Sequence, residues 1–185
     1  MTLPRVLDLI STAALDVPVV IMTYLNPVLA YGVQRFVRDA RDAGAAGVLL
    51  TDLPAGADPA IEATVQHSDL ALIRLVAPTT DDARLQDAVA GSTGFVYLIS
   101  RLGVTGARAD APPDLEAQVK RVRAAGTRDT RVAVGFGIGT PPQAAAAARS
   151  ADGVVVGSAL LDALATGGVA ALEQLTRDLA ATVHG

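Results

Sequence analysis

The chain has 185 residues, of which 51% are hydrophobic, and a formal net charge of -4 at pH 7. This length suits one domain with a sizeable core, so we interpret residues 1–185 as a single domain. The absence of any block of Lys and Arg argues against binding to nucleic acid or to an anionic membrane surface. No cysteine is present, which excludes disulfide and thiolate sites, and we expect a cytoplasmic protein.

Short apolar runs alternate with helical patterns along the whole chain, which is typical of βα units on a parallel sheet. A first helix is predicted near Arg5–Ala14, and a closing amphipathic helix at Val169–His184. The predicted strands are rich in Val, Ile and Leu, as in strands covered on both faces. They are Val17–Thr23, Gly47–Thr51, Ala71–Val76, Phe95–Ile99, Arg131–Gly135 and Gly153–Val156. The sequence therefore predicts an α/β fold with about six parallel βα units.

The ends of several helices carry recognisable boundary residues. Gly44 follows a predicted helix at Val33–Ala43, and Gly126 follows one at Leu115–Ala125, where a left-handed residue often ends a helix. Asp58 precedes a proline and predicts an N-cap. One long connection, Arg101–Pro113, interrupts this pattern, and loops of this length are usually functional lids or disordered segments.

Arg74 is a charge inside a predicted strand, on the face opposite Leu75. It therefore faces the flanking helices. A charge in that position needs an ionic partner or a route to solvent.

Glycines gather after the last two predicted strands, at Gly135–Gly139 (GFGIG) and at Gly157-Ser158, which opens a helix predicted at Ala159–Ala165. Ligands of parallel α/β folds bind at this end of the strands. Glycine lets backbone N–H groups approach an anion, and a helix N-terminus adds unpaired donors and a favourable dipole. The two segments predict a phosphate site. The alternative is that these glycines only form tight turns.

Other candidate residues carry weaker signals. Asp52 is the carboxylate at a predicted strand end, and we favour a structural or relay role over direct acid or base chemistry. His67 and His184 are interpreted as solvated, so no metal site is expected. Tyr97 is interpreted as a packed core residue. Phe95 and Phe136 predict an apolar pocket beside the phosphate site, which suits a ligand with a flat apolar body and a phosphate tail.

Five segments resemble, in order and spacing, the α chain of tryptophan synthase: MTYLNPVLAYG, GVLLTDLP, FVYLISRLGVTGA, VGFGI and GVVVGSALL. They span nearly the whole chain, and the second and third are highly specific. The resemblance implies a TIM-barrel, (β/α)8, fold, here as an incomplete barrel of about six βα units. It also implies a lyase of tryptophan biosynthesis, which performs the aldol cleavage of indole-3-glycerol phosphate to indole and glyceraldehyde 3-phosphate. The implied partner is the β chain, which carries the pyridoxal phosphate in a heterotetramer, and no cofactor is expected in this chain.

The resemblance also assigns roles to individual residues. Phosphate would be held by Gly106, Gly135, Gly137, Gly157 and Ser158. The indole would be surrounded by Leu49, Thr51, Leu75, Tyr97 and Phe136, with Thr105 in the mobile loop. The face toward the β chain would include Asn26, Pro27, Asp52 and Pro54.

The resemblance is incomplete at the N-terminal side of the family's pattern. The family's catalytic glutamate, and an aspartate that binds the indole nitrogen, belong to earlier strands and have no counterpart in these 185 residues. We therefore expect weak or absent lyase activity from this chain alone, with Asp52 as a supporting residue. An incomplete barrel also predicts self-association through open sheet edges. Two other functions stay open: another phosphate-binding TIM-barrel isomerase or synthase, and a non-catalytic modulator of the β chain.

Overall fold

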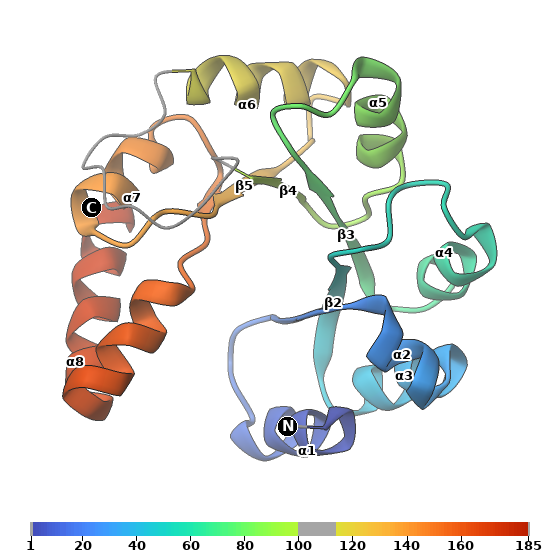
Figure 1. The fold of residues 1–185 in the computed structure, drawn as a ribbon, viewed down its shortest axis with the longest axis horizontal. Coiled ribbons are helices and arrows are strands. Elements are labelled where there is room, and N and C mark those ends of the chain that lie inside the picture. The colour runs from blue at the N-terminus through green and yellow to red at the C-terminus, as the bar shows by residue number, and fades with distance from the viewer. Residues whose placement is uncertain (1, 100–113, 185) are drawn as a thin grey trace. The chain divides into compact units, whose positions relative to one another are not determined.

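The computed structural model describes residues 2–99 and 114–184, shown in Figure 1. These residues form alternating helices and strands, as the sequence predicts. The helices are α1 (Leu3–Ala13), α2 (Leu25–Tyr31), α3 (Val33–Asp42), α4 (Pro59–Gln66), α5 (Asp82–Ala90), α6 (Leu115–Ala124), α7 (Pro141–Ala148) and α8 (Ser158–His184). The strands are β1 (Val19–Thr23), β2 (Ala45–Leu50), β3 (Ala71–Val76), β4 (Val96–Ile99), β5 (Val132–Gly135) and β6 (Gly153–Val154).

The chain divides into two compact units. The first contains Met1–Leu75 and Asp82–Val96, and the second contains Val76–Asp81 and Tyr97–Gly185. Within each unit the strands follow one another in chain order, with β1, β2 and β3 in the first and β4, β5 and β6 in the second. The pairs β1–β2, β2–β3 and β5–β6 are parallel. The expectation of a single domain stays a prediction.

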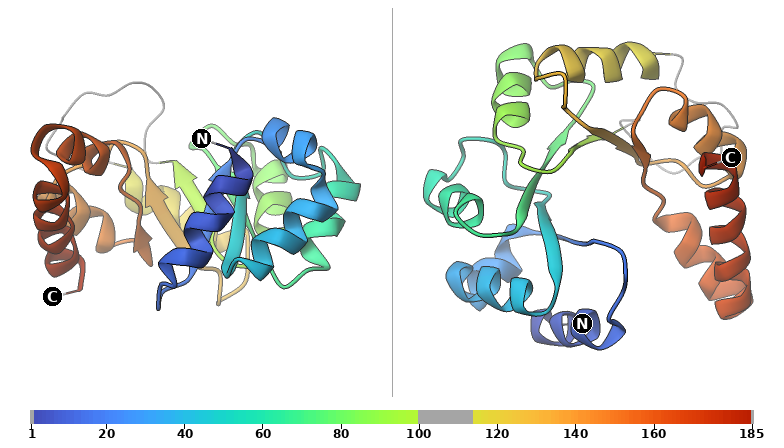
Figure 2. Two further views of the ribbon diagram at one scale, coloured as in Figure 1. Left: turned by 90° about the horizontal axis from the view of Figure 1, so that it is seen from below. Right: turned by 180° about the vertical axis from the view of Figure 1, so that it is seen from behind.

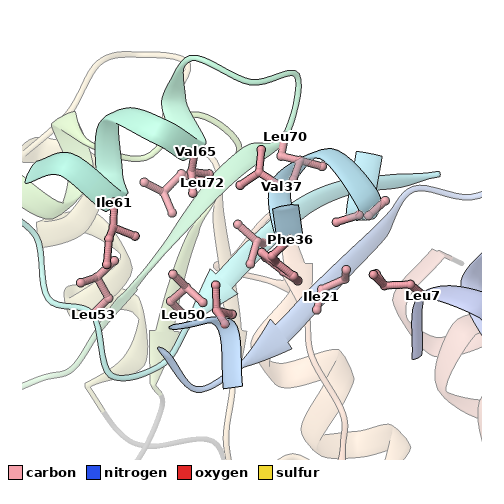
Figure 3. Packing of buried hydrophobic residues seen from close by; sticks show 14 residues of the cluster. Leu7, Ile21, Phe36, Val37, Leu50, Leu53, Ile61, Val65, Leu70 and Leu72 are labelled. Atoms are coloured by element: carbon pink, nitrogen blue, oxygen red, sulfur yellow. The ribbon is translucent and has the colours of Figure 1, made fainter. Parts of the chain in front are cut away.

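The core of the first unit lies between its strands and helices α1, α2, α3 and α4 (Figure 3). Phe36 of α3 is fully buried and packs with Ile21 of β1 and Leu50 of β2. Alternate strand residues point to opposite faces, so this core takes one face of each strand. Each Å² of apolar surface that these side chains remove from water stabilises the folded state by roughly 25 cal/mol. This burial is the main stabilisation of such a unit.

The strand boundaries differ from the predicted ones by one or two residues. β1 begins at Val19 rather than Val17 because Pro18 has no N–H to donate to a ladder, and Val17 is 64% exposed. β2 begins two residues earlier than predicted, at Ala45, and β6 ends at Val154 rather than Val156. Along the described sheet order, β1 has β2 as its one neighbour. As a result, Asp52 lies two residues beyond the end of β2, and Gly157 lies three residues beyond the end of β6.

Helices α2 and α3 meet at a corner that is closed by a polar cluster. Gly32 lies between them at a φ of 92°, which favours glycine. The Tyr31 hydroxyl donates to Asp39 Oδ2 at 2.8 Å, and the Arg35 guanidinium lies 4.4 Å from the centre of the Tyr31 ring. The hydrogen bond from Tyr31 holds the pKa of Asp39 below its ordinary value, with further support from Arg38 and Arg35. The ionised Asp39 therefore stabilises the corner.

Because Asp39 is ionised in this corner, we expect the variant Asp39→Asn to be less stable than the wild type by an amount that depends on pH. A carboxyl whose pKa is lowered by folding contributes stability above its unfolded pKa of about 3.9 and loses it as the pH falls through the folded value. We expect the wild type to melt above Asp39→Asn at pH 7, and the two melting curves to converge below about pH 4. Circular dichroism melting at several pH values measures this difference. A gap that does not depend on pH would contradict the role of the Asp39 charge.

In the second unit, Asp152 joins the starts of β5 and β6. Its Oδ2 accepts from the Val132 N–H and from Arg123 Nη2, both at 2.9 Å, and Arg131 lies 3.4 Å from its Oδ1. Partial burial raises the pKa of Asp152, but the Val132 N–H and the two arginines outweigh it and leave the pKa below its ordinary value. The anionic carboxylate of Asp152 therefore holds the starts of β5 and β6 together.

The end of the second unit is formed by α7 and α8, which lie side by side (Figure 2). α8 contains a break at Gly168, whose φ of 68° and ψ of -163° are not helical. The break separates a segment that begins at Ser158 from one that ends at His184. This confirms the two helices predicted at Ala159–Ala165 and Val169–His184.

The prediction for Gly126 is wrong. Gly126 is absent from the glycines with positive φ among residues 2–99 and 114–184, whereas Gly44 has the expected φ of 95°. After α6, Ala125 keeps a right-handed helical conformation, and the Gly126 N–H donates to the Arg123 carbonyl in a tighter last turn. The chain then turns through a hydrogen bond from the Thr127 N–H to Thr130 Oγ1.

In the part of the chain that the structure describes, no helix is both long enough and apolar enough to cross a bilayer.

Candidate functional site

The loop after β5 carries the GFGIG segment and turns sharply. Phe136 has a φ of 68° and Gly137 a φ of 85°. A left-handed conformation is unusual for phenylalanine, and such strain is concentrated at functional positions. The turn directs the backbone toward α7, where Gln143 Oε1 accepts from the Gly139 N–H at 2.9 Å. This hydrogen bond attaches the loop to the first turn of α7.

The start of α8 lies against this loop. A methyl group added at Gly139 would come within 3.1 Å of the Ala159 Cβ, so Gly139 and Ala159 are close neighbours. The Gly157 carbonyl accepts from the Leu160 N–H at 3.0 Å and opens the helix. The first N–H groups of a helix have no intrahelical acceptor, and the helix dipole makes this end attractive to anions. The space beside Gly157 is open, because a methyl group added there meets no described heavy atom within 4 Å.

Tyr97 of β4 lies against the other end of the GFGIG segment. Its ring is 5% exposed and meets the Phe136 ring edge to face, with centroids 5.9 Å apart and planes at 81°. Burial raises the pKa of the Tyr97 hydroxyl, which therefore stays protonated at neutral pH. Gly135 is needed here because a Cβ at this position would lie 1.9 Å from Tyr97 Oη. Phe136 itself is 46% exposed and presents an apolar surface.

In the first unit, the loop after β2 carries Asp52 and is attached to the start of α2. Asp52 Oδ1 accepts from the Leu25 N–H at 2.6 Å, and the Thr51 N–H donates to the Thr23 carbonyl at 3.0 Å. Asn26 and Pro27 follow Leu25 in α2 and are exposed, as is Pro54. The structure thus brings the segments that carry Asn26, Pro27, Asp52 and Pro54 together.

The three remaining predicted contacts of an indole lie on one face of the first unit's strands. Val48 and Leu50 of β2 point into the core that α3 and α4 cover, so Leu49 and Thr51 point to the opposite face. Leu49 is 2% exposed, and Leu75 of β3 is half-buried. Thr105 and Gly106, together with the rest of the predicted loop Arg101–Pro113, lie outside the described residues.

Two structural features near these segments were not predicted from the sequence. Thr140 and Gln143 form a reciprocal capping box at the start of α7, and the T-x-x-Q spacing was a readable signal for it. The partner that Arg74 needs is Glu62 of α4, with Arg74 Nη2 2.5 Å from Glu62 Oε2. An acid on the inward face of the flanking helix was the available signal. Across residues 2–99 and 114–184, the side chains form no cluster of three or more metal-ligating residues.

The amino-acid sequence matches the family model of the tryptophan synthase alpha chain over residues 1–184. It is 49% identical over 151 residues to the tryptophan synthase alpha chain of Acidiphilium cryptum, covering 82% of this chain and 54% of that protein. It is 45% identical over 186 residues to the tryptophan synthase alpha chain of Gluconacetobacter diazotrophicus, covering 97% of this chain and 67% of that protein. The chain therefore spans about half to two thirds of the length of these curated relatives.

Solved structures share the fold. Tryptophan synthase of Mycobacterium tuberculosis in space group F222 aligns with a TM-score of 0.90 at 41% identity, covering 99% of this chain and 69% of that one. The tryptophan synthase alpha chain of Legionella pneumophila aligns with a TM-score of 0.87 at 30% identity, covering 100% of this chain and 70% of that one. The predicted α/β fold of the TIM-barrel family is confirmed, with six strands in the residues described.

Proposed function

Because the chain belongs to the tryptophan synthase alpha chain family, we propose that it contributes the phosphate-binding part of a lyase acting on indole-3-glycerol phosphate. The products of that reaction are indole and glyceraldehyde 3-phosphate. The observation that carries the proposal is the contact between the GFGIG loop and the start of α8, where Gly139 adjoins Ala159. Family membership favours this substrate over those of other phosphate-binding isomerases or synthases.

The proposed phosphate ligands are backbone N–H groups. Gly137 has a left-handed backbone that other residues adopt with strain, and Gly157 and Ser158 offer a helix N-terminus beside open space. Gly135 supports this arrangement by admitting the Tyr97 ring. Gly106, which the family's pattern adds to this set, lies outside the described residues. Among the residues described, an anionic phosphate would be held by backbone N–H donors and by the dipole of α8.

The proposed indole contacts are apolar. The exposed face of Phe136 lies beside the phosphate segment, and its edge-to-face contact with Tyr97 holds the ring in place. A flat heterocycle joined to a phosphate tail would satisfy both features. Leu49, Thr51, Leu75 and Thr105 stay proposed indole contacts on the family's pattern.

We propose that cleavage by this chain alone is weak or absent. The reaction needs a general acid and a general base beside the indole. Asp52 Oδ1 is already engaged by the Leu25 N–H at 2.6 Å, which supports a structural or relay role for this carboxylate. The resemblance places the family's catalytic glutamate outside these 185 residues, which supports this proposal. The family carries no cofactor in its α chain, and pyridoxal phosphate belongs to the β chain.

A second function is favoured by the exposed segment formed by Asn26, Pro27 and Pro54. Asp52 ties its two parts together, which would present a defined surface to a β chain. The chain would then modulate β activity without performing the cleavage. The competing proposal is that the chain associates with itself through the side of β1 that has no neighbouring strand among the residues described. Sedimentation would distinguish self-association from binding to a β chain.

The first experiment measures indole release from indole-3-glycerol phosphate by the purified chain, with and without a β chain. Glyceraldehyde 3-phosphate is titrated in parallel while thermal unfolding is recorded. We expect no turnover and a rise in melting temperature, since a ligand that binds only the folded state stabilises it. Raised β activity would support modulation. Turnover by the chain alone would contradict the proposed inactivity, and the absence of any thermal shift would contradict the phosphate site.

A further inference from the structure

Arg74 is a buried cation that the proposed function does not use. It lies in β3 with 3% of its surface exposed, on the same face as Leu72 and toward α4. The turn after α5 closes over it, since a Cβ at Gly91 would lie 3.4 Å from Arg74 Nε and Nη2. A guanidinium keeps its proton at any ordinary pH, so the charge stays in this apolar setting.

The ion pair of Arg74 with Glu62 reaches the β2–α4 loop, residues 51–58, at two points. Arg74 Nη1 donates to the Leu53 carbonyl at 3.4 Å. Glu62 Oε1 accepts from the Gly56 N–H at 2.8 Å, and Gly56 has a φ of 78°. The pair therefore contacts a carbonyl on one side of the loop and an N–H on the other.

The same loop is attached to a second element on its outer side. Asp52 Oδ1 accepts from the Leu25 N–H of α2 at 2.6 Å, while the Leu53 side chain is buried in the core. Asp52 is thus one residue away from the carbonyl that Arg74 contacts. Movement of Leu53 would displace Asp52 and loosen its bond to α2.

Stability alone is a poor explanation for this arrangement. Among the residues described, the Nε and Nη2 N–H groups of Arg74 find no acceptor in hydrogen-bond geometry, although Nη2 lies close to Glu62. A buried ion pair can often be replaced by apolar side chains of similar volume with no loss of stability. What an apolar pair cannot do is hold the Leu53 carbonyl and the Gly56 N–H.

We infer that Arg74, acting through Glu62, is a positioning residue that sets the β2–α4 loop so that Asp52 engages α2 and Pro54 faces outward. One part of the inference rests on the proposed function: that the positioned loop forms a surface for a β chain. The other part, that Arg74 and Glu62 position the loop, rests only on contacts within the first unit.

The test uses the full chain with the double substitution Arg74→Met and Glu62→Met. Native-state hydrogen exchange is followed at Gly56 and Leu25, whose N–H groups depend on the loop. We expect both to exchange about tenfold faster or more, while the Phe36 amide, bonded to the Gly32 carbonyl at 2.8 Å, changes less than about twofold. Protection of Gly56 and Leu25 that stays at the wild-type level in the folded double variant overturns the inference.

Two further variants keep this result interpretable. Asp152→Asn is the matched control, because it removes the carboxylate charge from a partly exposed ion-pair contact in the other unit, and Leu25 exchange should stay at the wild-type level. If the double variant does not fold, Arg74→Lys replaces it. A lysine ammonium retains the charge but lacks the fork that contacts Glu62 and Leu53 together, so Leu25 exchange should still rise. Wild-type exchange in that variant also overturns the inference.

The functional half is measured as affinity for a β chain of this family. We expect the double variant to bind about tenfold more weakly than the wild type, with Asp152→Asn close to the wild type. Faster exchange with unchanged affinity overturns the link between the loop and the partner. If the wild type itself binds no β chain, the proposed partner is wrong, and the exchange result alone decides whether Arg74 positions the loop.

Discussion

The variant Gly135→Ala is expected to lose about 3 kcal/mol of unfolding free energy or more, at the upper end of what overpacking costs. The added Cβ would lie 1.9 Å from Tyr97 Oη, 2.5 Å from Cζ and 3.0 Å from Cε1. The Tyr97 ring is almost completely buried and is held by Phe136, so it has little room to move away. Urea unfolding followed by circular dichroism measures the change.

A matched control is available in the same unit. Gly153 also lies in a strand, but a Cβ there would meet the Ala133 Cβ at an ordinary 3.5 Å. Gly153→Ala should therefore change stability much less than Gly135→Ala. Equal stability of the two variants would show that the Gly135–Tyr97 contact is not as tight as the structure has it.

Double substitutions would locate the clash. Tyr97→Phe removes only the hydroxyl and leaves Cζ within 2.5 Å of the new Cβ, so it should rescue Gly135→Ala poorly. Tyr97→Ala removes the ring and should make the two changes non-additive, because the residues are in contact. Full rescue by Tyr97→Phe would indicate that the ring can shift.

The variant Gly157→Asp is expected to weaken binding of glyceraldehyde 3-phosphate by about 100-fold or more, because like charges brought together cost several kcal/mol. The aspartate would place its charge at the N-terminus of α8, where the phosphate is proposed to bind. No described heavy atom lies within 4 Å of a Cβ added at Gly157, and φ is not positive at this residue, so the chain should tolerate the side chain. The measurement is the ligand-induced rise in melting temperature.

Gly157→Ala serves as the control for this variant. It adds a Cβ in the same open space without charge, and both variants should unfold like the wild type in the absence of ligand. Alanine should weaken binding less than aspartate does. Equal binding by the aspartate variant and the wild type would contradict a phosphate site at the start of α8.

The sequence predicted the fold well because its strands are short, apolar and bounded by turn residues. Buried strands such as Ala71–Val76 have few polar positions, so their limits were clear. The two helices on either side of Gly168 were also predicted. The prediction of a left-handed Gly126 was wrong although a glycine after a helix often has that conformation. Here α6 ends in a tighter turn, followed by the Thr127–Thr130 hydrogen bond, and no left-handed residue is needed.

The partners of the site residues could not be predicted, because they come from distant positions. Arg74 indicated that a partner was needed, but only the packing of α4 on β3 identifies Glu62. The contact of Asp52 with Leu25 likewise joins residues 27 positions apart. The tight approach of Tyr97 to Gly135 depends on the register of neighbouring strands. Such contacts follow from the fold and have no periodic signal in the chain.

The ion pair between Arg74 and Glu62 also has a consequence for how this family diverges. Removing one partner leaves a buried charge without its counter-ion and strongly destabilises the fold. Replacing both partners together costs far less stability. A lineage should therefore pass between the charged and the apolar pair through paired or closely successive substitutions. Homologues with an apolar residue at the position of Arg74 should have lost the acid at the position of Glu62, and in them another contact should hold the glycine N–H of the β2–α4 loop.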